Sequence, residues 1–208
     1  MRGFSLVFAL VALAALLLAA AGMLRSVNTG SLVIGNLGFR QDAVAASSAG
    51  AEAAIAYLQA NVAGVTLDAD HPAAGYYATS LANLDVTGGV TSAAHKMALV
   101  DWDADGCADA DASSYDTSAC LQAAPAKTVN GNTVSWIAMR LCTTSGSYAP
   151  GNPCTTPAAA ATSNAADRGE LTGGGRISSV VTSPYYRIVV RVLGPRHSVS
   201  YTETMVHF

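Results

Sequence analysis

The chain begins with a continuous apolar segment and then changes to a mixed pattern. Residues 4–24 contain no charged side chain and are dominated by leucine, alanine and valine. As a helix this segment would extend roughly 31 Å, close to the thickness of the hydrocarbon core of a bilayer. The pattern therefore predicts a transmembrane helix over residues 4–24.

The helical pattern continues beyond the apolar segment. Residues 25–60 contain no proline, are rich in alanine, and place apolar side chains at spacings near those of one helix face. Gly50 interrupts this stripe, and the earlier glycines (22, 30, 35 and 38) each weaken a helix by about 1 kcal/mol relative to alanine. We expect one long helix, amphipathic over residues 25–60, in which the earlier glycines mark either a loosened stretch or close helix packing. The stripe consists of Val27, Leu32, Ile34, Leu37, Phe39, Ala43, Ala46, Ala54, Ile55 and Leu58.

Beyond Leu58 the pattern predicts a small α+β head over residues 61–208. Residues 185–193 alternate with period two, and a turn at 194–197 leads into a second alternating run, so a C-terminal β-hairpin is expected. Residues 132–142 and 96–102 are further strand candidates. We expect a small antiparallel sheet that packs on the second half of the long helix, with loops over 61–92 and 143–184.

Composition and charge narrow the function. The 208 residues leave room for one head, and only 12% of them are charged, with a formal net charge of −3. Because no basic patch occurs, we predict no nucleic-acid binding by this chain. No nucleophile elbow, phosphate-binding glycine loop or zinc-protease motif occurs either. The sequence therefore predicts neither enzymatic activity nor a small-molecule substrate.

Four cysteines, Cys107, Cys120, Cys142 and Cys154, lie in the predicted head. Their spacing does not fit paired zinc ligands, so two disulfides are the natural interpretation. Three pairings are possible. The local one, Cys107–Cys120 with Cys142–Cys154, is favoured because it closes two short loops of similar length, each worth about 3 kcal/mol. The connectivity stays open at this point.

An acidic loop resembles the early part of a calcium-binding loop. Asp101, Asp103, Asp105 and Asp109 occupy positions one, three, five and nine, with glycine at six. The closing glutamate is missing, because position twelve is Ala112. Calcium is therefore one interpretation, and a solvated acidic turn at a strand end is the other. No other cofactor is expected.

The first residues suggest processing. Met1, Arg2 and Gly3 precede Phe4, and this resembles a prepilin peptidase site, where cleavage follows a glycine and leaves a phenylalanine at the new N-terminus. Residues 1–3 would then be a leader peptide. The small residues at 19–22 offer a signal-peptidase site as an alternative.

Several segments together resemble the PilX family of minor pilins of the type IV pilus. The segments are Gly35-Asn36-Leu37, Phe39-Arg40-Gln41, Ala51-Glu52-Ala53-Ala54, and residues 130–137, 140–142, 186–192, 194–196 and 199–201.

The resemblance implies a pilin-like fold and a role in assembly. The subunit would take part in a priming or tip complex that supports pilus biogenesis, adhesion and twitching motility. Its partners would be other minor pilins, the major pilin and a large tip adhesin. Gly35, Asn36, Arg40 and Glu52 would belong to the helix-assembly region. The implied location is the inner membrane, with a single span and a periplasmic head, and later the pilus at the cell surface.

Phe8 departs from the common pilin pattern. It would be the fifth residue of the mature chain, where most pilins carry a glutamate, and its apolar side chain suits a subunit at or near the filament tip. A K-type minor pseudopilin of type II secretion shares this departure and is the first alternative. The second alternative is a secreted or lipid-anchored calcium-binding domain released by cleavage after Ala21.

Overall fold

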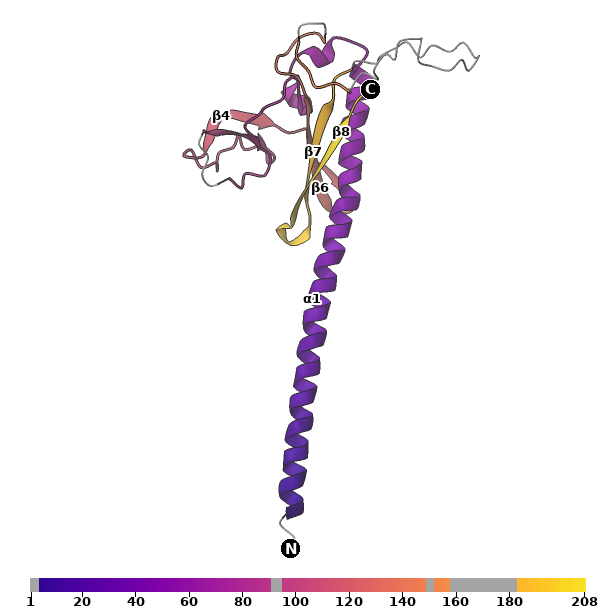
Figure 1. The fold of residues 1–208 in the computed structure, drawn as a ribbon, viewed down its shortest axis with the longest axis vertical. Helices are drawn as coiled ribbons and strands as arrows, with labels where there is room; N and C mark the ends of the chain where they lie inside the picture. Colours follow the sequence, from indigo (N-terminus) through magenta and orange to yellow (C-terminus); the bar gives the residue numbers. More distant parts are fainter. Residues whose placement is uncertain (1–3, 91–94, 149–151, 158–182) are drawn as a thin grey trace, which may run out of the picture. The chain divides into compact units, whose positions relative to one another are not determined.

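The protein is described here by a computed structural model that covers residues 4–90, 95–148, 152–157 and 183–208 (Figure 1). Contacts divide the chain into two compact units, Met1–Asp42 and Ala43–Phe208. The elements are α1 (Phe4–Asn61), three short 3-10 helices and eight strands. The 3-10 helices are η1 (Thr66–Asp68), η2 (Pro72–Ala74) and η3 (Pro195–His197).

Helix α1 runs without a break from Phe4 to Asn61. The long helix predicted from the sequence is therefore confirmed in extent. The loosened stretch considered around the first four glycines does not form, since all four lie inside the helix. Gly35 has no described atom within 4 Å of the position where a Cβ would stand.

The transmembrane prediction is corrected. No helix in the described part of the chain is both long and apolar enough to cross a bilayer. Beyond the N-terminal apolar segment, residues 34–61 of α1 carry Arg40, Asp42 and Glu52. A transmembrane helix over 4–24 and a single-pass location in the inner membrane were therefore wrong, whereas an α+β fold remains.

The larger sheet has five strands. Its central path is β1 (Tyr76–Tyr77), β6 (Asn132–Arg140), β7 (Tyr186–Leu193) and β8 (Val199–Val206), and β5 (Lys127–Val129) also pairs with β6. Strands β6, β7 and β8 are antiparallel, as predicted, with β7 and β8 in register over eight pairs. Strand β1 is parallel to β6, which the sequence analysis did not foresee.

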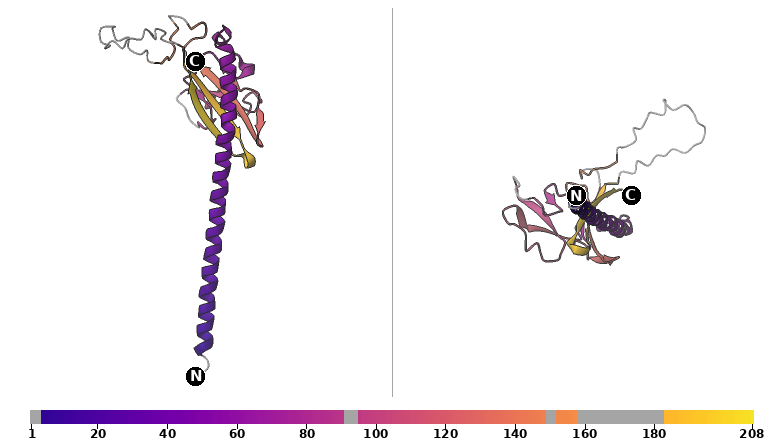
Figure 2. Two further views of the ribbon diagram at one scale, coloured as in Figure 1. Left: turned by 90° about the vertical axis from the view of Figure 1, so that its right-hand side faces the viewer. Right: turned by 90° about the horizontal axis from the view of Figure 1, so that it is seen from below.

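One face of this sheet packs on the second half of α1. Figures 1 and 2 both show strands β6 to β8 beside that part of the helix. Alternation decides which side chains face it, because successive residues of a strand point to opposite faces. The resulting core joins Ala43, Ala46, Ala54 and Leu58 of α1 to Val134, Trp136, Ala138, Ile188, Val190 and Val192 of the sheet.

A second sheet covers the other face and corrects the predicted all-antiparallel head. It consists of β2 (Leu84–Asp85), β3 (Met97–Asp101) and β4 (Tyr115–Gln122), and all its pairings are parallel. Val100 and Leu121 from this sheet pack against Ile137, Met139 and Val189 of the larger one. The head therefore has three layers: the second half of α1, the five-stranded sheet and the small parallel sheet.

The predicted loops are only partly loops. Residues 61–92 contain η1, η2, β1 and β2. Much of the predicted loop 143–184 lies outside the described residues, but Thr155 donates its N–H to the Leu141 carbonyl at 2.7 Å and accepts the Tyr185 N–H at 2.9 Å. This short segment bridges the end of β6 and the approach to β7.

Candidate functional site

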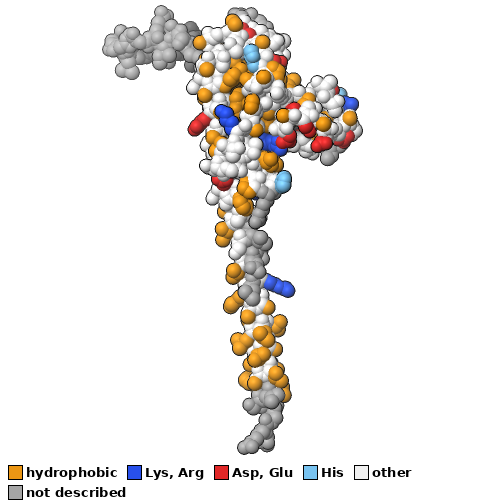
Figure 3. Space-filling view, turned by 180° about the vertical axis from the view of Figure 1, so that it is seen from behind, with side chains coloured by type: hydrophobic (Ala, Val, Ile, Leu, Met, Phe, Trp, Pro, Cys, Tyr) orange, Lys and Arg blue, Asp and Glu red, His pale blue; other side chains and the backbone are white. Residues whose placement is uncertain are grey.

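The most unusual surface in the described structure is the apolar part of α1. Large apolar side chains are exposed along the helix, and Figure 3 shows them in orange along its lower part. Leu16, Leu17 and Leu18 retain 71%, 62% and 76% of their exposure. We call the set the apolar run of α1: Val7, Phe8, Leu10, Val11, Leu13, Leu16, Leu17, Leu18, Met23, Val27, Ile34 and Leu37, each at least 55% exposed.

The side chains of the apolar run point to all sides of the helix. Three consecutive helical residues point in directions about 100° apart, so Leu16, Leu17 and Leu18 together face three sides. All three are exposed. A surface helix of a globular domain carries one apolar stripe, whereas a helix that is apolar all round belongs in an apolar interior. One flat partner would cover only one side of this part of the helix, and several neighbours would be required to cover all of it.

The predicted helix-assembly residues lie on the exposed surface of α1. Phe8 is 73% exposed, and Asn36, Arg40 and Glu52 are exposed as well. Gly35 presents bare backbone at the helix surface. Of the two cleavage-site residues, Gly3 lies outside the described residues and Phe4 is the first residue of α1.

Gly50 has a different role from the one its place in the stripe suggested. A Cβ at this position would lie 2.6 Å from Val190 Cγ1 and 2.7 Å from Val134 Cγ1. The interruption of the stripe is therefore the point where the helix backbone approaches β6 and β7 most closely among the described glycines of α1. Periodicity detects the missing side chain but not the sheet that requires its absence.

Both disulfides of the local pairing are present. Cys107 bonds Cys120 and Cys142 bonds Cys154, with no free cysteine. The first bond ties the loop after β3 to β4. That loop is the connection between two parallel strands, which normally needs a crossover of a dozen or more residues. Two disulfides are typical of proteins that fold in an oxidising compartment.

The acidic loop uses its carboxylates internally. Asp101 accepts the N–H groups of Asp105 and Gly106, each at 3.0 Å, and Asp105 accepts the Cys107 N–H at 2.9 Å. Asp103 lies 2.7 Å from the Arg191 guanidinium of β7. Within the described residues no group of three or more acidic, histidine or cysteine side chains is placed to hold a metal, and Asp109 joins none. Calcium binding by this loop stays a prediction.

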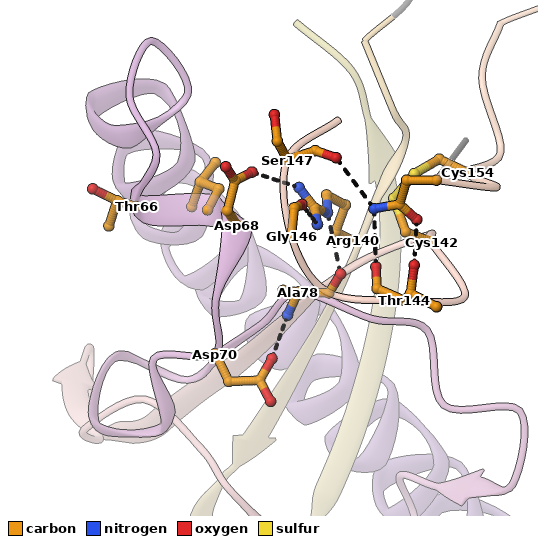
Figure 4. A network of polar contacts seen from close by, with 12 residues as sticks. Thr66, Asp68, Asp70, Ala78, Arg140, Cys142, Thr144, Gly146, Ser147 and Cys154 are labelled. Carbon is orange, nitrogen blue, oxygen red and sulfur yellow. Dashed lines mark hydrogen bonds and ion pairs between the residues drawn. A yellow bond between two sulfur atoms is a disulfide. The ribbon is translucent and has the colours of Figure 1, made fainter. Parts of the chain in front are cut away.

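A buried arginine links several segments of the head. Arg140 is 2% exposed; its Nε donates to the Ala78 carbonyl at 3.1 Å, and its Nη2 to the Gly146 carbonyl at 2.6 Å (Figure 4). Its Nη1 lies 3.2 Å from Asp68. Gly146 lies in the Cys142–Cys154 loop and returns its own N–H to the Asp68 carbonyl at 2.7 Å. A buried charge of this kind needs every partner, so Arg140 joins η1, β6 and the disulfide loop into one unit.

A buried carboxylate fixes the small parallel sheet. Asp85 is 7% exposed and accepts the Thr87 N–H and hydroxyl, the Val90 N–H and the Tyr115 hydroxyl, at 2.8 to 3.0 Å. Burial alone would raise the pKa of Asp85, but these hydrogen bonds to the charged form outweigh it and lower the pKa to about 2. Sequence reasoning missed Asp85 because nothing in its local pattern distinguishes it from a solvated loop aspartate.

The aromatic side chains serve packing. Tyr186 is buried in the main core and contacts Phe208, with ring centroids 5.9 Å apart. Tyr201 lies 6.0 Å from Trp102, and Tyr185 meets His207 edge-on at 5.3 Å. Cross-strand and core packing therefore accounts for the described ring contacts of these three tyrosines.

Comparison with known proteins adds no family. No protein-family model, curated protein or solved structure matches the chain.

Proposed function

We propose that this protein is a minor-pilin-like subunit of a type IV pilus or a related filament, and that the apolar run of α1 is its assembly surface. The observation that carries the proposal is the exposure of that run on all sides. Exposed apolar area of this extent marks an interaction surface. In a filament the helices of sister subunits surround one another, which would supply the several neighbours this helix needs.

The sequence features support the same role. The resemblance to the PilX family includes Gly35, Asn36 and Arg40 on the exposed helix and Glu52 on the solvent side of its second half. The other proposed contacts follow from that resemblance: fellow minor pilins, the major pilin and a large tip adhesin. In this proposal the protein acts by binding, and the head supplies a rigid body stapled by two disulfides.

Phe8 supports a place at or near the filament tip. Its side chain is 73% exposed and apolar at the position where most pilins carry a glutamate. A K-type minor pseudopilin would share this feature and differ in its partners. Deletion of the gene in a piliated host and in a host with a type II secretion system separates the two roles, since only one of the two processes should fail.

Two single aspartate substitutions test the assembly surface. Leu13→Asp and Leu17→Asp place charges in the apolar run, at residues 57% and 62% exposed. We expect each variant to fold normally but to form no filaments, as checked by electron microscopy of cells and of the material sheared from them. The matched control is Val65→Asp, which places the same charge at an apolar residue that is 80% exposed outside α1. Normal filaments from the helix variants would overturn the proposal.

N-terminal sequencing of the mature protein tests the processing step. A chain that begins at Phe4, with or without methylation, supports cleavage by prepilin peptidase, and Gly3→Ser should then block both cleavage and filament rescue. A chain that begins at Gly22 would instead indicate signal peptidase and would favour the secreted-domain alternative.

A further inference from the structure

The two edges of the five-stranded sheet are treated differently. On one edge, β1 and β5 both pair with β6 and cover it with strands of two and three residues. On the other edge, β8 pairs with β7 over eight residues without a register shift, and it pairs with no other strand in the described part of the chain. In an antiparallel pair every second residue of the outer strand directs its N–H and C=O away from its partner. Among the described residues, none bonds to these outward groups of β8.

Strand β8 also lacks the usual protection of an edge. Natural edges are shortened, bulged, or given lysine or proline, because an open edge recruits another strand. β8 reads Val-Ser-Tyr-Thr-Glu-Thr-Met-Val and has neither proline nor a basic residue. Its only charge, Glu203, is held at 2.9 Å by Arg187 of β7. Val199 and Met205 are 45% and 58% exposed at its two ends.

The charge pattern of β8 selects a partner. We propose that β8 pairs antiparallel with β8 of a second copy of this chain, with Thr202 on the two-fold axis, so that the two heads share one continuous sheet. In this register Val199 faces Met205 of the second copy, and Tyr201 faces Glu203. Moving the two-fold axis from Thr202 to Glu203, which slides the register by two residues, would place Glu203 opposite Glu203 of the second copy, and like charges directly opposite are unfavourable.

The pairing is self-complementary, as a two-fold interface must be. Apolar side chains meet at both ends, and the Tyr201 hydroxyl can donate to the facing carboxylate. Because one strand pair buries less area than a standard interface, we expect weak association, with a dissociation constant of roughly 10 µM or above. This inference concerns the head and does not depend on the proposed assembly role of α1.

Charge exchange tests the pairing on the full chain, held in a non-ionic detergent that coats the apolar run of α1. Val199→Lys with Met205→Lys places two lysine pairs in the dimer, and Val199→Glu with Met205→Glu places two glutamate pairs. Both substituted positions are exposed and lie near the ends of β8. Folding should therefore persist, and circular dichroism checks it. We expect each double variant alone to dissociate at least tenfold more readily than wild type in sedimentation equilibrium. A mixture of the two should associate again as a heterodimer.

Any one of three results would overturn the inference: the wild type stays monomeric in detergent up to about 500 µM, the charged double variants associate as strongly as wild type, or a mixture of the two double variants does not associate. If a double variant fails to fold, amide hydrogen exchange of wild-type β8 decides, because pairing must slow exchange at its outward amides as concentration rises. Leu13→Asp serves as the control that separates the two proposals, since it should block filaments and leave β8 pairing unchanged.

Discussion

Helix α1 contains two apolar stretches in which the size of the side chains and their burial do not go together. The apolar run carries the larger side chains, such as Leu17, yet these are exposed. Half of the residues in the stretch 43–58 are alanine, yet Ala46, Ala54 and Leu58 are at most 1% exposed. The more hydrophobic stretch is thus the uncovered one.

The difference teaches what each stretch is shaped to meet. Residues 43–58 meet a sheet of the same chain at short range, and small residues let the two backbones approach, with Gly50 at the closest point. The apolar run has large side chains in every direction, which fits a surrounding of several separate neighbours. Small residues therefore mark the contact made within the chain, whereas the large ones lie on the part of the helix that stays exposed among the described residues.

Truncation of one leucine in each stretch is the strongest way to break this comparison. Leu58→Ala removes a fully buried side chain and should lower the free energy of unfolding of the head by about 3 kcal/mol. Leu17→Ala removes the same atoms from a side chain that is 62% exposed and should change it by less than about 0.5 kcal/mol. Urea unfolding followed by tryptophan fluorescence measures both. Similar losses for the two variants would show that the apolar run is packed against the head.

The fold could be predicted where a pattern repeats locally. The period-two run at 185–193 predicted β7 (Tyr186–Leu193) within one residue. The continuous helix was predicted for the same reason. The parallel sheet was not, because β4 (Tyr115–Gln122) alternates poorly, with exposed Asp116, Thr117 and Ser118 in sequence. Its position depends on the Cys107–Cys120 bond and the crossover loop, which are long-range constraints.

The candidate surface was predicted in place but interpreted wrongly in part. The apolar pattern was interpreted as a bilayer-spanning helix, because a helix that is apolar on all sides is typical both of membrane spans and of protein interiors. Arg140 was noticed only as part of a motif, and its three partners come from residues 68, 78 and 146. Such a network depends on chain topology, which the local sequence does not contain.

Acid should sharpen the comparison, because it acts on the head, which packs on residues 43–58, and not on the apolar run. Residues 4–41 contain no aspartate or glutamate, whereas the head depends on Asp85, whose pKa is lowered from 3.8 to about 2. The unfolded chain takes up this proton first as the pH falls. The stabilisation, about 2 kcal/mol, is therefore fully present above about pH 5 and is lost progressively as the pH falls from there toward 2.

Urea unfolding at several pH values measures this loss, and Asp85→Asn provides the reference. The variant should be less stable at pH 7 and should lose less stability than wild type between pH 5 and 2. Asp111 and Asp116 also have lowered pKa values, through hydrogen bonds from Ser113 and Ser118, and they titrate equally in both proteins. An identical pH dependence for the two proteins would remove Asp85 from the account.

The smallest expected effect comes from a methyl group added to one glycine in each stretch. Gly35→Ala adds it where no described atom lies within 4 Å, so the gain in helix propensity, up to about 1 kcal/mol, should appear as increased helicity. Gly50→Ala makes the same gain but places the methyl 2.6 Å from Val190 Cγ1 and 2.7 Å from Val134 Cγ1. Both neighbours are β-branched residues of a buried sheet and have little freedom to move. Overpacking should therefore exceed the gain and leave a net loss of about 1–2 kcal/mol. Circular dichroism and urea unfolding of the two variants measure the opposite signs, and a stabilising Gly50→Ala would show that the helix and the sheet are not in close contact there.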